Sequence, residues 1–106
     1  MVILDIKSRV GKRVTLDEER WRHIQDHPEM NGEIDRLRET LLEPDEVRRS
    51  IYDASVWLFY RHYSSTPVTE KYLLAVVRLT NEEGFIITAF FTDTVKRGGL
   101  LWSRNP

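Results

Sequence analysis

The stretch KYLLAVVRLTNEEGFIITAFFT, residues 71–92, carries the strongest secondary-structure signal in the chain. Two runs rich in branched and aromatic residues, 71–80 and 85–92, flank the polar segment NEEG at 81–84. Runs of this kind around a short turn are typical of a β-hairpin. Strands joined in sequence order by short connections favour an antiparallel meander. The stretch therefore predicts the centre of an antiparallel sheet.

Further strands are predicted on both sides of the helical region. Residues 46–52 and 56–63 precede the hairpin, and the second of these segments is rich in aromatic residues. Residues 2–6 contain Val and Ile in a pattern that favours a first strand. The tail, residues 94–106, contains the apolar run LLW and is expected to dock back onto the domain.

Two helices are predicted before the sheet. Thr15 and Glu18 match a capping box for the first helix, and Pro28 is expected to end it near His27. Asn31 is a suitable N-cap for the second helix, which Pro44 ends. Its apolar stripe consists of Ile34, Leu37, Leu41 and Leu42. We therefore expect an α+β fold, with two N-terminal helices packed on a four-stranded, or slightly larger, antiparallel sheet.

Composition limits the class of protein. The chain has 106 residues and no cysteine, which predicts one domain over residues 1–106 and excludes disulfides and thiol chemistry. No segment reaches the ~20 apolar residues of a membrane span, and the N-terminus lacks the pattern of a signal peptide. We therefore expect a cytoplasmic protein.

The charges are unevenly distributed, although the net charge is only −1. Residues 17–46 carry eleven acidic and four basic side chains, and the rest of the chain carries six acidic and twelve basic side chains. Either the helices simply collect Glu, or the basic sheet surface faces a polyanion.

His23 and His27 are four residues apart in the first predicted helix, so they are expected to share one face. Histidine is the side chain best suited to exchange protons near neutral pH, which favours an acid/base pair. A His-xxx-His metal site is the second interpretation, but the sequence offers no obvious third ligand. In the third, one imidazole caps the helix end and the other packs against the core.

The aromatic segment at 56–63 contains one arginine. Arg61 is costly to bury unless a carboxylate or another anion pairs with it. It therefore forms either a structural ion pair or a clamp for a phosphate. Tyr60 and Tyr63 of the same strand are either core residues or platforms for stacking a base.

Hydroxyl and basic side chains elsewhere extend the candidate site. Thr88 and Thr92 share one face of the last predicted strand and could bind a phosphate, although Thr is also a good strand former. Lys71 and Lys96, at a strand start and after the last strand, could add positive charge. Arg49 belongs to a short basic edge.

Six motifs, in order, resemble a known group of nucleases. They are WRHIQDHPE (21–29), LLEPDEVRRS (41–50), LFYR (58–61), KYLLAVV (71–77), GFIITAFFT (84–92) and KRGGLLW (96–102). Over about residues 14–102 the chain resembles the phage and prokaryotic branch of the barnase–EndoU–colicin–RelE-like nucleases. The matching positions are His23, His27, Arg61, Lys71 and Thr88.

This resemblance implies helices packed on a four-stranded antiparallel sheet that binds RNA. It implies cleavage of RNA without a metal or another cofactor, and many relatives are toxins that a small antitoxin protein inhibits. The sequence pI of 6.3 departs from the basic character of several relatives.

We therefore expect a metal-independent endoribonuclease, the toxin of a toxin–antitoxin pair, that cleaves by attack of the ribose 2′-hydroxyl. His23 and His27 are expected as acid and base in unassigned order, Arg61 and Lys71 as charge stabilisers, and Thr88 as a phosphate ligand. Further RNA contacts are expected at Arg49, Tyr60, Tyr63, Thr92 and Lys96. Two alternatives are a non-catalytic RNA- or protein-binding module, and an inactive nuclease fold with an immunity or regulatory role.

Overall fold

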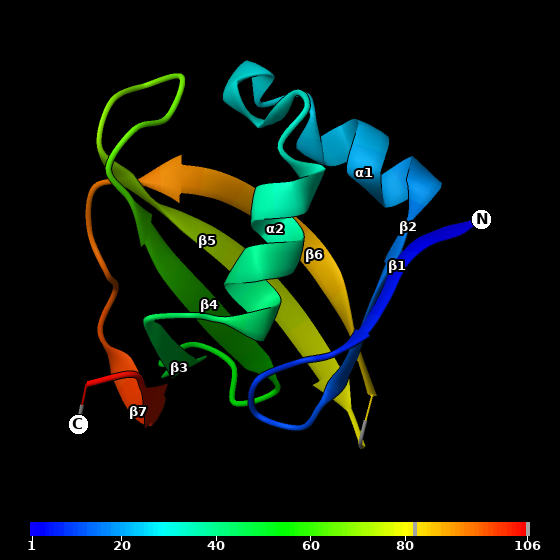
Figure 1. Cartoon of the computed structure of the whole chain (residues 1–106). Helices are drawn as coiled ribbons and strands as arrows, with labels where there is room; N and C mark the ends of the chain where they lie inside the picture. The colour runs from blue at the N-terminus through cyan, green and yellow to red at the C-terminus, as the bar shows by residue number, and fades with distance from the viewer. Residues whose placement is uncertain (82, 106) are drawn as a thin grey trace.

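The computed structural model describes residues 1–81 and 83–105, which form a seven-stranded sheet in the order β1-β2-β6-β5-β4-β3-β7 (Figure 1). The strands are β1 (Val2–Lys7), β2 (Arg13–Asp17), β3 (Glu46–Ser50), β4 (Val56–Tyr63), β5 (Lys71–Thr80), β6 (Glu83–Thr92) and β7 (Gly98–Ser103). The helices are α1 (Glu18–Ile24), the short 3₁₀ helix η1 (Pro28–Met30) and α2 (Ile34–Leu42). The predicted α+β class is confirmed.

The predicted meander forms the middle of the sheet. Strands β3, β4, β5 and β6 pair antiparallel in sequence order. The bounds of β4 and β5 agree with the predicted segments. The turn predicted at 81–84 includes residue 82, which lies outside the described residues.

The sheet is larger than predicted and mixed, so the expected four-stranded antiparallel sheet is wrong in detail. The first two strands form a hairpin before the helices, and β2 pairs parallel with the start of β6 through Thr15 opposite Phe85. Val14 and Leu16 of β2 are buried in the main core. Local pattern in residues 14–16 predicts only a helix cap at Thr15, because their pairing partner is about seventy residues away in the chain.

The C-terminal tail docks as predicted and adds strand β7, which pairs antiparallel with β3. A glycine is needed at Gly98, because a Cβ there would lie 2.2 Å from the carbonyl oxygen of Arg49. At the neighbouring Gly99, a Cβ would meet nothing closer than the Cβ of Arg49 at 3.9 Å. The tail therefore reaches β3 through a close backbone contact.

Helix boundaries differ from the prediction in a way that matters for the histidines. Asp17, and not Thr15, caps α1, and its carboxylate accepts a hydrogen bond of 2.9 Å from the backbone N–H of Glu19. Helix α1 ends at Ile24, so His27 stands in extended backbone conformation just before η1. The two histidines therefore do not share one face of a continuous helix. Similarly, α2 begins after Glu33 and not after Asn31.

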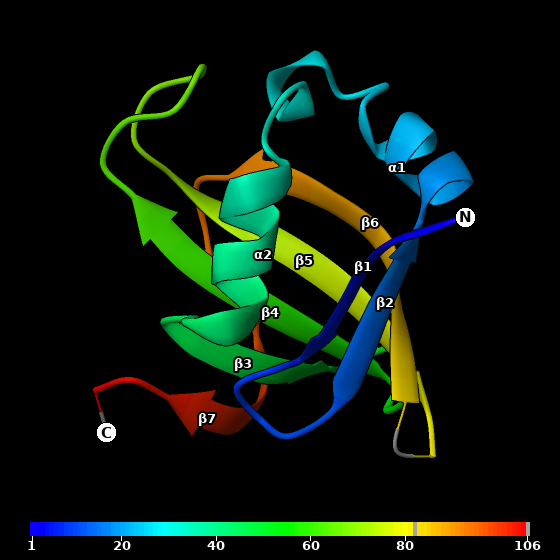
Figure 2. The same ribbon diagram turned by 45° about the vertical axis from the view of Figure 1, so that its right-hand side comes forward.

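The two faces of the sheet have different cover. On the helix face, α2 lies across the sheet and buries the main core, which includes Leu37, Phe59 and Leu73 (Figures 1 and 2). The opposite, helix-free face carries a smaller cluster of Val56, Leu58, Tyr60 and Leu74, against which Val95 packs. Among the described residues, no helix is long and apolar enough to cross a membrane.

Replacing Gly98 with alanine is expected to lower the free energy of unfolding by about 1–3 kcal/mol, because the new methyl group overlaps the Arg49 carbonyl. Gly99→Ala is the matched control and is expected to change stability by less than about 0.5 kcal/mol. Urea unfolding measures both variants. Equal stabilities for the two variants would contradict the close β3–β7 contact.

Candidate active site

Strand β2 pairs with only the first part of β6. The parallel register runs from Arg13 opposite Glu83 to Thr15 opposite Phe85, and the chain then turns into α1. Beyond this point, α1 and η1 pack beside β6 (Figure 2). This arrangement places side chains of the helical region next to the outer edge of the strand.

His27 lies beside the C-terminal part of β6. Its ring centroid is 5.7 Å from that of Phe90, and the two rings are tilted by 39°. Its Nδ1 lies 4.0 Å from a carboxylate oxygen of Glu29, and about half of the side chain is exposed. Phe90 packs against the helix-free cluster, so His27 borders that face.

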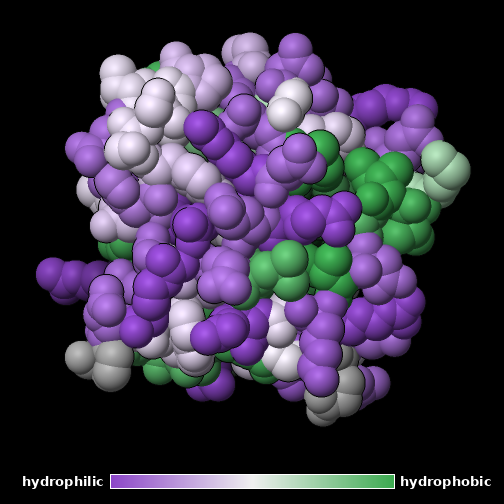
Figure 3. Space-filling view, viewed as in Figure 1, coloured by the Kyte–Doolittle hydropathy of each residue, from purple (hydrophilic) through white to green (hydrophobic). Residues whose placement is uncertain are grey.

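His23 lines a groove of about 500 Å³ beside the N-terminal part of β6. The groove is also lined by Val2, Thr15, Asp17, Glu19, Arg20, Phe85 and Ile86. The Nδ1 atom of His23 lies 3.9 Å from a carboxylate oxygen of Asp26, and the histidine side chain is well exposed. Near this groove, apolar side chains gather where the N-terminal strands meet α1 (Figure 3), and Val2 is 56% exposed.

Thr88 lies between these two positions on β6. It pairs with Val76 of β5, which packs against the helix-free cluster, and paired residues point to the same side of a sheet. Phe85 pairs with Arg78 and points to that side as well. We call the set Phe85, Thr88 and Phe90, with His23 and His27 beside it, the β6 track.

Thr92 continues the same face of β6 beyond Phe90. It pairs with Tyr72, and its hydroxyl bonds weakly with the backbone of Thr94 at 3.4 Å. The structure thus brings four of the predicted site residues to one strand: His23, His27, Thr88 and Thr92.

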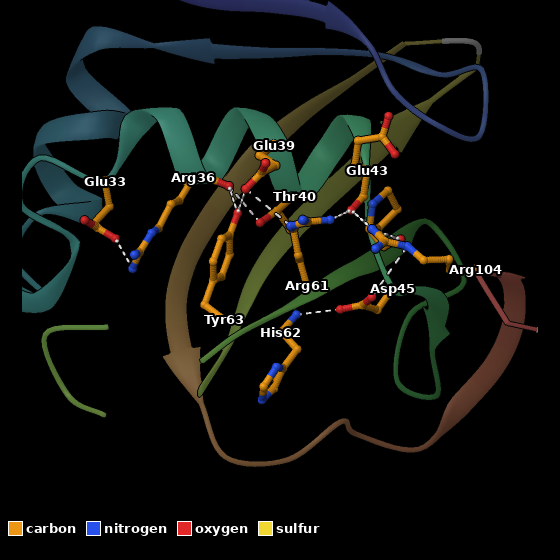
Figure 4. Close-up of polar contacts among 11 residues, drawn as sticks. Glu33, Arg36, Glu39, Thr40, Glu43, Asp45, Arg61, His62, Tyr63 and Arg104 are labelled. Carbon is orange, nitrogen blue, oxygen red and sulfur yellow. Dashed lines mark hydrogen bonds and ion pairs between the residues drawn. The ribbon is translucent and has the colours of Figure 1, made fainter. Parts of the chain in front are cut away.

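Arg61 lies on the helix face of the sheet, where the end of α2 supplies its polar partners (Figure 4). One guanidinium N–H donates to the carbonyl oxygen of Glu43 at 2.5 Å, at the C-terminal end of α2. Its Nε is 3.3 Å from a carboxylate oxygen of Glu39 but is not aligned for a hydrogen bond. These contacts are those of the structural ion pair, and Arg61 does not border the β6 track.

Tyr63 belongs to the same network. Its hydroxyl donates to a carboxylate oxygen of Glu39 at 2.6 Å, and the guanidinium of Arg61 lies 5.5 Å from its ring centroid. Burial and the neighbouring Glu39 carboxylate raise the pKa of the Tyr63 phenol above its ordinary value. A proton held this firmly serves to tie β4 to α2.

The remaining predicted residues are spread over the sheet. Lys71 forms an ion pair with Asp93 and stands opposite Tyr63 in the register. Tyr60 is fully buried, which raises its pKa, and its hydroxyl accepts a hydrogen bond of 3.0 Å from the backbone N–H of Lys96. The side chains of Lys96 and Arg49 are exposed.

A bound metal ion would need several ligand side chains grouped around one point. Within residues 1–81 and 83–105, no three His, Asp or Glu side chains are grouped closely enough to hold a metal ion.

Comparison with known proteins identifies the family of the chain. The model of the family described as phage-Barnase-EndoU-ColicinE5/D-RelE like nuclease2 matches residues 4–103. The chain belongs to this nuclease family. Neither the curated proteins nor the solved structures gave a significant match. The match confirms the resemblance to this group of nucleases that the sequence motifs indicated.

The geometry adds residues to this nuclease that sequence patterns miss. Arg20 and Phe85 line the same groove as His23, and Phe85 is 42% exposed. Their proximity depends on the β2–β6 pairing, which no local signal reveals. The third histidine, His62, lies on β4, where its Nε2 is 3.0 Å from a carboxylate oxygen of Glu70 and its ring centroid 5.3 Å from that of Tyr72.

Arg61→Met is expected to lower the free energy of unfolding by about 1.5–3 kcal/mol, because the charged hydrogen bond to the Glu43 carbonyl is lost. Nuclease activity measured well below the unfolding transition is expected to stay within about threefold of wild type. Tyr63→Phe is the companion variant, with an expected loss of about 1 kcal/mol. Strong loss of activity in folded Arg61→Met would instead support a phosphate clamp.

Proposed function

We propose that the chain is a metal-independent endoribonuclease that cuts single-stranded RNA along the β6 track. The observation that carries this proposal is the position of His23 and His27, which border one strand on either side of Thr88. Family membership supports the nuclease class. The choice of RNA rests on the sequence resemblance and on the chemistry that this arrangement offers.

The proposed reaction is an internal transesterification. One imidazole takes the proton from the ribose 2′-hydroxyl, whose oxygen attacks the adjacent phosphorus. The bond to the 5′ oxygen of the next nucleotide breaks, and the second histidine, as an imidazolium, donates a proton to that oxygen. The products are a 2′,3′-cyclic phosphate and a free 5′-hydroxyl. Positioned acid and base groups accelerate such reactions by about 10²–10⁴-fold each.

Negative charge on the phosphoryl oxygens must be stabilised as the bonds change. Arg61 and Lys71 are held by Glu39 and Asp93, respectively. Arg20 is better placed, because it is exposed, lines the groove with His23 and has no ion-pair partner within the described chain. Thr88 contributes a hydroxyl that can donate to a phosphoryl oxygen.

Aromatic residues of the track provide surfaces for bases. Recognition of single-stranded RNA commonly uses stacking of unpaired bases on aromatic rings. Phe85 is 42% exposed, and Phe90 is partly exposed beside His27. In this arrangement, separate bases of the bound RNA stack on these two rings.

The purified chain is expected to cleave single-stranded RNA in the presence of EDTA and to leave cyclic phosphate ends. His23→Ala and His27→Ala should each reduce the cleavage rate at least about 100-fold, because each removes a proton-transfer group. His62→Ala is the matched control, since that imidazole lies away from the track, and its rate should stay within about threefold of wild type. Labelled RNA resolved by chain length and end group gives the readout.

Salt-sensitive RNA binding without cleavage would contradict the catalytic proposal and favour a binding module. Loss of activity on chelation would favour a metal-dependent site. A large effect of His62→Ala, with no effect of His23→Ala, would move the catalytic pair away from the β6 track.

Arg20→Ala is expected to lower kcat/KM at least about tenfold, because a cation near the phosphate is lost from the transition state. Arg38→Ala removes another exposed arginine, from α2, and serves as the control for net charge. Both variants should unfold at the same urea concentration as wild type. Equal activities of the two variants would exclude Arg20 from the site.

We extend the proposal to a toxin role with a small antitoxin protein as partner, on the resemblance to relatives that act in this way. Expression of the wild-type chain alone should arrest growth, and His27→Ala should abolish the arrest at equal protein level. Arrest that persists in His27→Ala would separate toxicity from cleavage.

A further inference from the structure

A second groove lies on the helix-free side, between the turn that follows β3 and the 93–97 loop. Its volume is about 280 Å³. It is lined by Ser50, Ile51, Tyr52, Leu58, Lys96 and Arg97. None of the residues that define the β6 track contributes to it.

Hydrogen bonds between side chains and the backbone hold both walls of this groove. The buried hydroxyl of Tyr60 accepts from the backbone N–H of Lys96 at 3.0 Å, and a guanidinium N–H of Arg48 donates to the carbonyl oxygen of Gly98 at 3.1 Å. On the facing wall, the hydroxyl of Ser50 accepts from the backbone N–H of Tyr52 at 3.1 Å. The walls are thus fixed while the side chains of Tyr52 and Lys96 stay exposed.

The chemistry of this groove is aromatic and cationic. Tyr52 is 89% exposed, which is unusual for a large ring without a partner. Lys96 and Arg97 form no ion pair with any residue of the described ranges, and no Asp or Glu lines the groove. By contrast, other arginines of the sheet, such as Arg48 and Arg78, are paired with carboxylates.

The groove is aligned with the β6 track. Leu58, in its floor, pairs with Val76, and Val76 pairs with Thr88. The three residues form one row across neighbouring strands, so Leu58 and Thr88 are two strand spacings apart, roughly 10 Å. An RNA chain that crosses the sheet from Thr88 would reach the groove within a few nucleotides.

We propose that this groove is a nucleotide-binding subsite for single-stranded RNA, with a base stacked on Tyr52 and a phosphate held by Lys96 and Arg97. The inference rests on the proposed function, because it places a flanking nucleotide of the substrate. Stacking on exposed aromatic rings between cationic groups is how proteins hold single strands without strong sequence preference. A protein partner would need a far larger surface, about 800 Å² on each side.

The test measures binding of a fluorescently labelled 2′-O-methyl oligoadenylate of eight nucleotides, which cannot undergo attack by its own 2′ oxygen. Tyr52→Ala is expected to raise Kd by about 5- to 100-fold, because the stacking surface is lost. Tyr52→Trp keeps an aromatic surface and should stay within about threefold of wild type. Because the probe is not cleaved, this result does not depend on catalysis.

A second arm tests the cations. The double variant Lys96→Ala/Arg97→Ala should reduce the slope of log Kd against log salt by about 1.4, since each phosphate contact on a single strand contributes about 0.7. Arg38→Ala is the control, and its slope should equal that of wild type because Arg38 lies on α2, away from the groove. An unchanged slope in the double variant would overturn the phosphate contact.

Several results would overturn the inference. They are no binding of the oligonucleotide by wild type, an unchanged Kd in Tyr52→Ala, and equal weakening by Tyr52→Ala and Tyr52→Trp. Dependence on Tyr52 for poly-L-glutamate but not for the oligonucleotide would assign the groove to an acidic protein. Tyr52-dependent RNA binding by a wild-type chain that cleaves nothing would support the subsite and sink only the catalytic proposal.

Discussion

The short parallel pairing between β2 and β6 is the constraint on which the site depends. It holds three residue pairs, and Gly84 lies at its centre opposite Val14. A Cβ at Gly84 would lie 2.6 Å from the side chain of Leu79 and 2.9 Å from that of Val77, so glycine lets these β5 side chains pack closely against β6 at this point. Because β2 leaves β6 after Phe85, the rest of the strand edge is free for the segment that carries both histidines. A longer β2 would displace that segment and the imidazoles with it.

The same architecture divides the basic side chains into two groups. Arg61 and Lys71 are engaged by carboxylates and by the end of α2, and they contribute to stability. Arg20, Lys96 and Arg97 are exposed and have no ion-pair partner in the part of the chain that the structure describes. The net charge of −1 therefore conceals a small set of free cations on the surfaces proposed to meet RNA.

Much of the fold could be predicted from the sequence, because its central strands are long and apolar. β4 and β5 have the predicted bounds, since most of their residues are buried and strand-like. Strand β2 could not be predicted from its own residues, because a segment of five residues is recognised as a strand only when its distant partner is known. The tail was predicted to dock, but its role as a strand depends on the close approach at Gly98.

The candidate site was predictable in part. His23, His27 and Thr88 stand out by residue type and resemblance, and the structure places all three beside β6. Arg61 stood out for the same reason, yet its charge is satisfied by α2, which a sequence cannot show. Arg20 carries no local signal, because its value depends on a groove formed by three separate segments.

The proposed site requires both imidazoles and Thr88 to contact the substrate at one position on the sheet, which a nuclear magnetic resonance titration can measure. A 2′-O-methyl dinucleotide is added to the labelled wild-type chain, and the ring protons of all three histidines are followed with the Thr88 amide. We expect the signals of His23, His27 and Thr88 to shift together with one saturation curve, while those of His62 stay unchanged. Movement of His62 alone, or of only one of the two edge histidines, would contradict it.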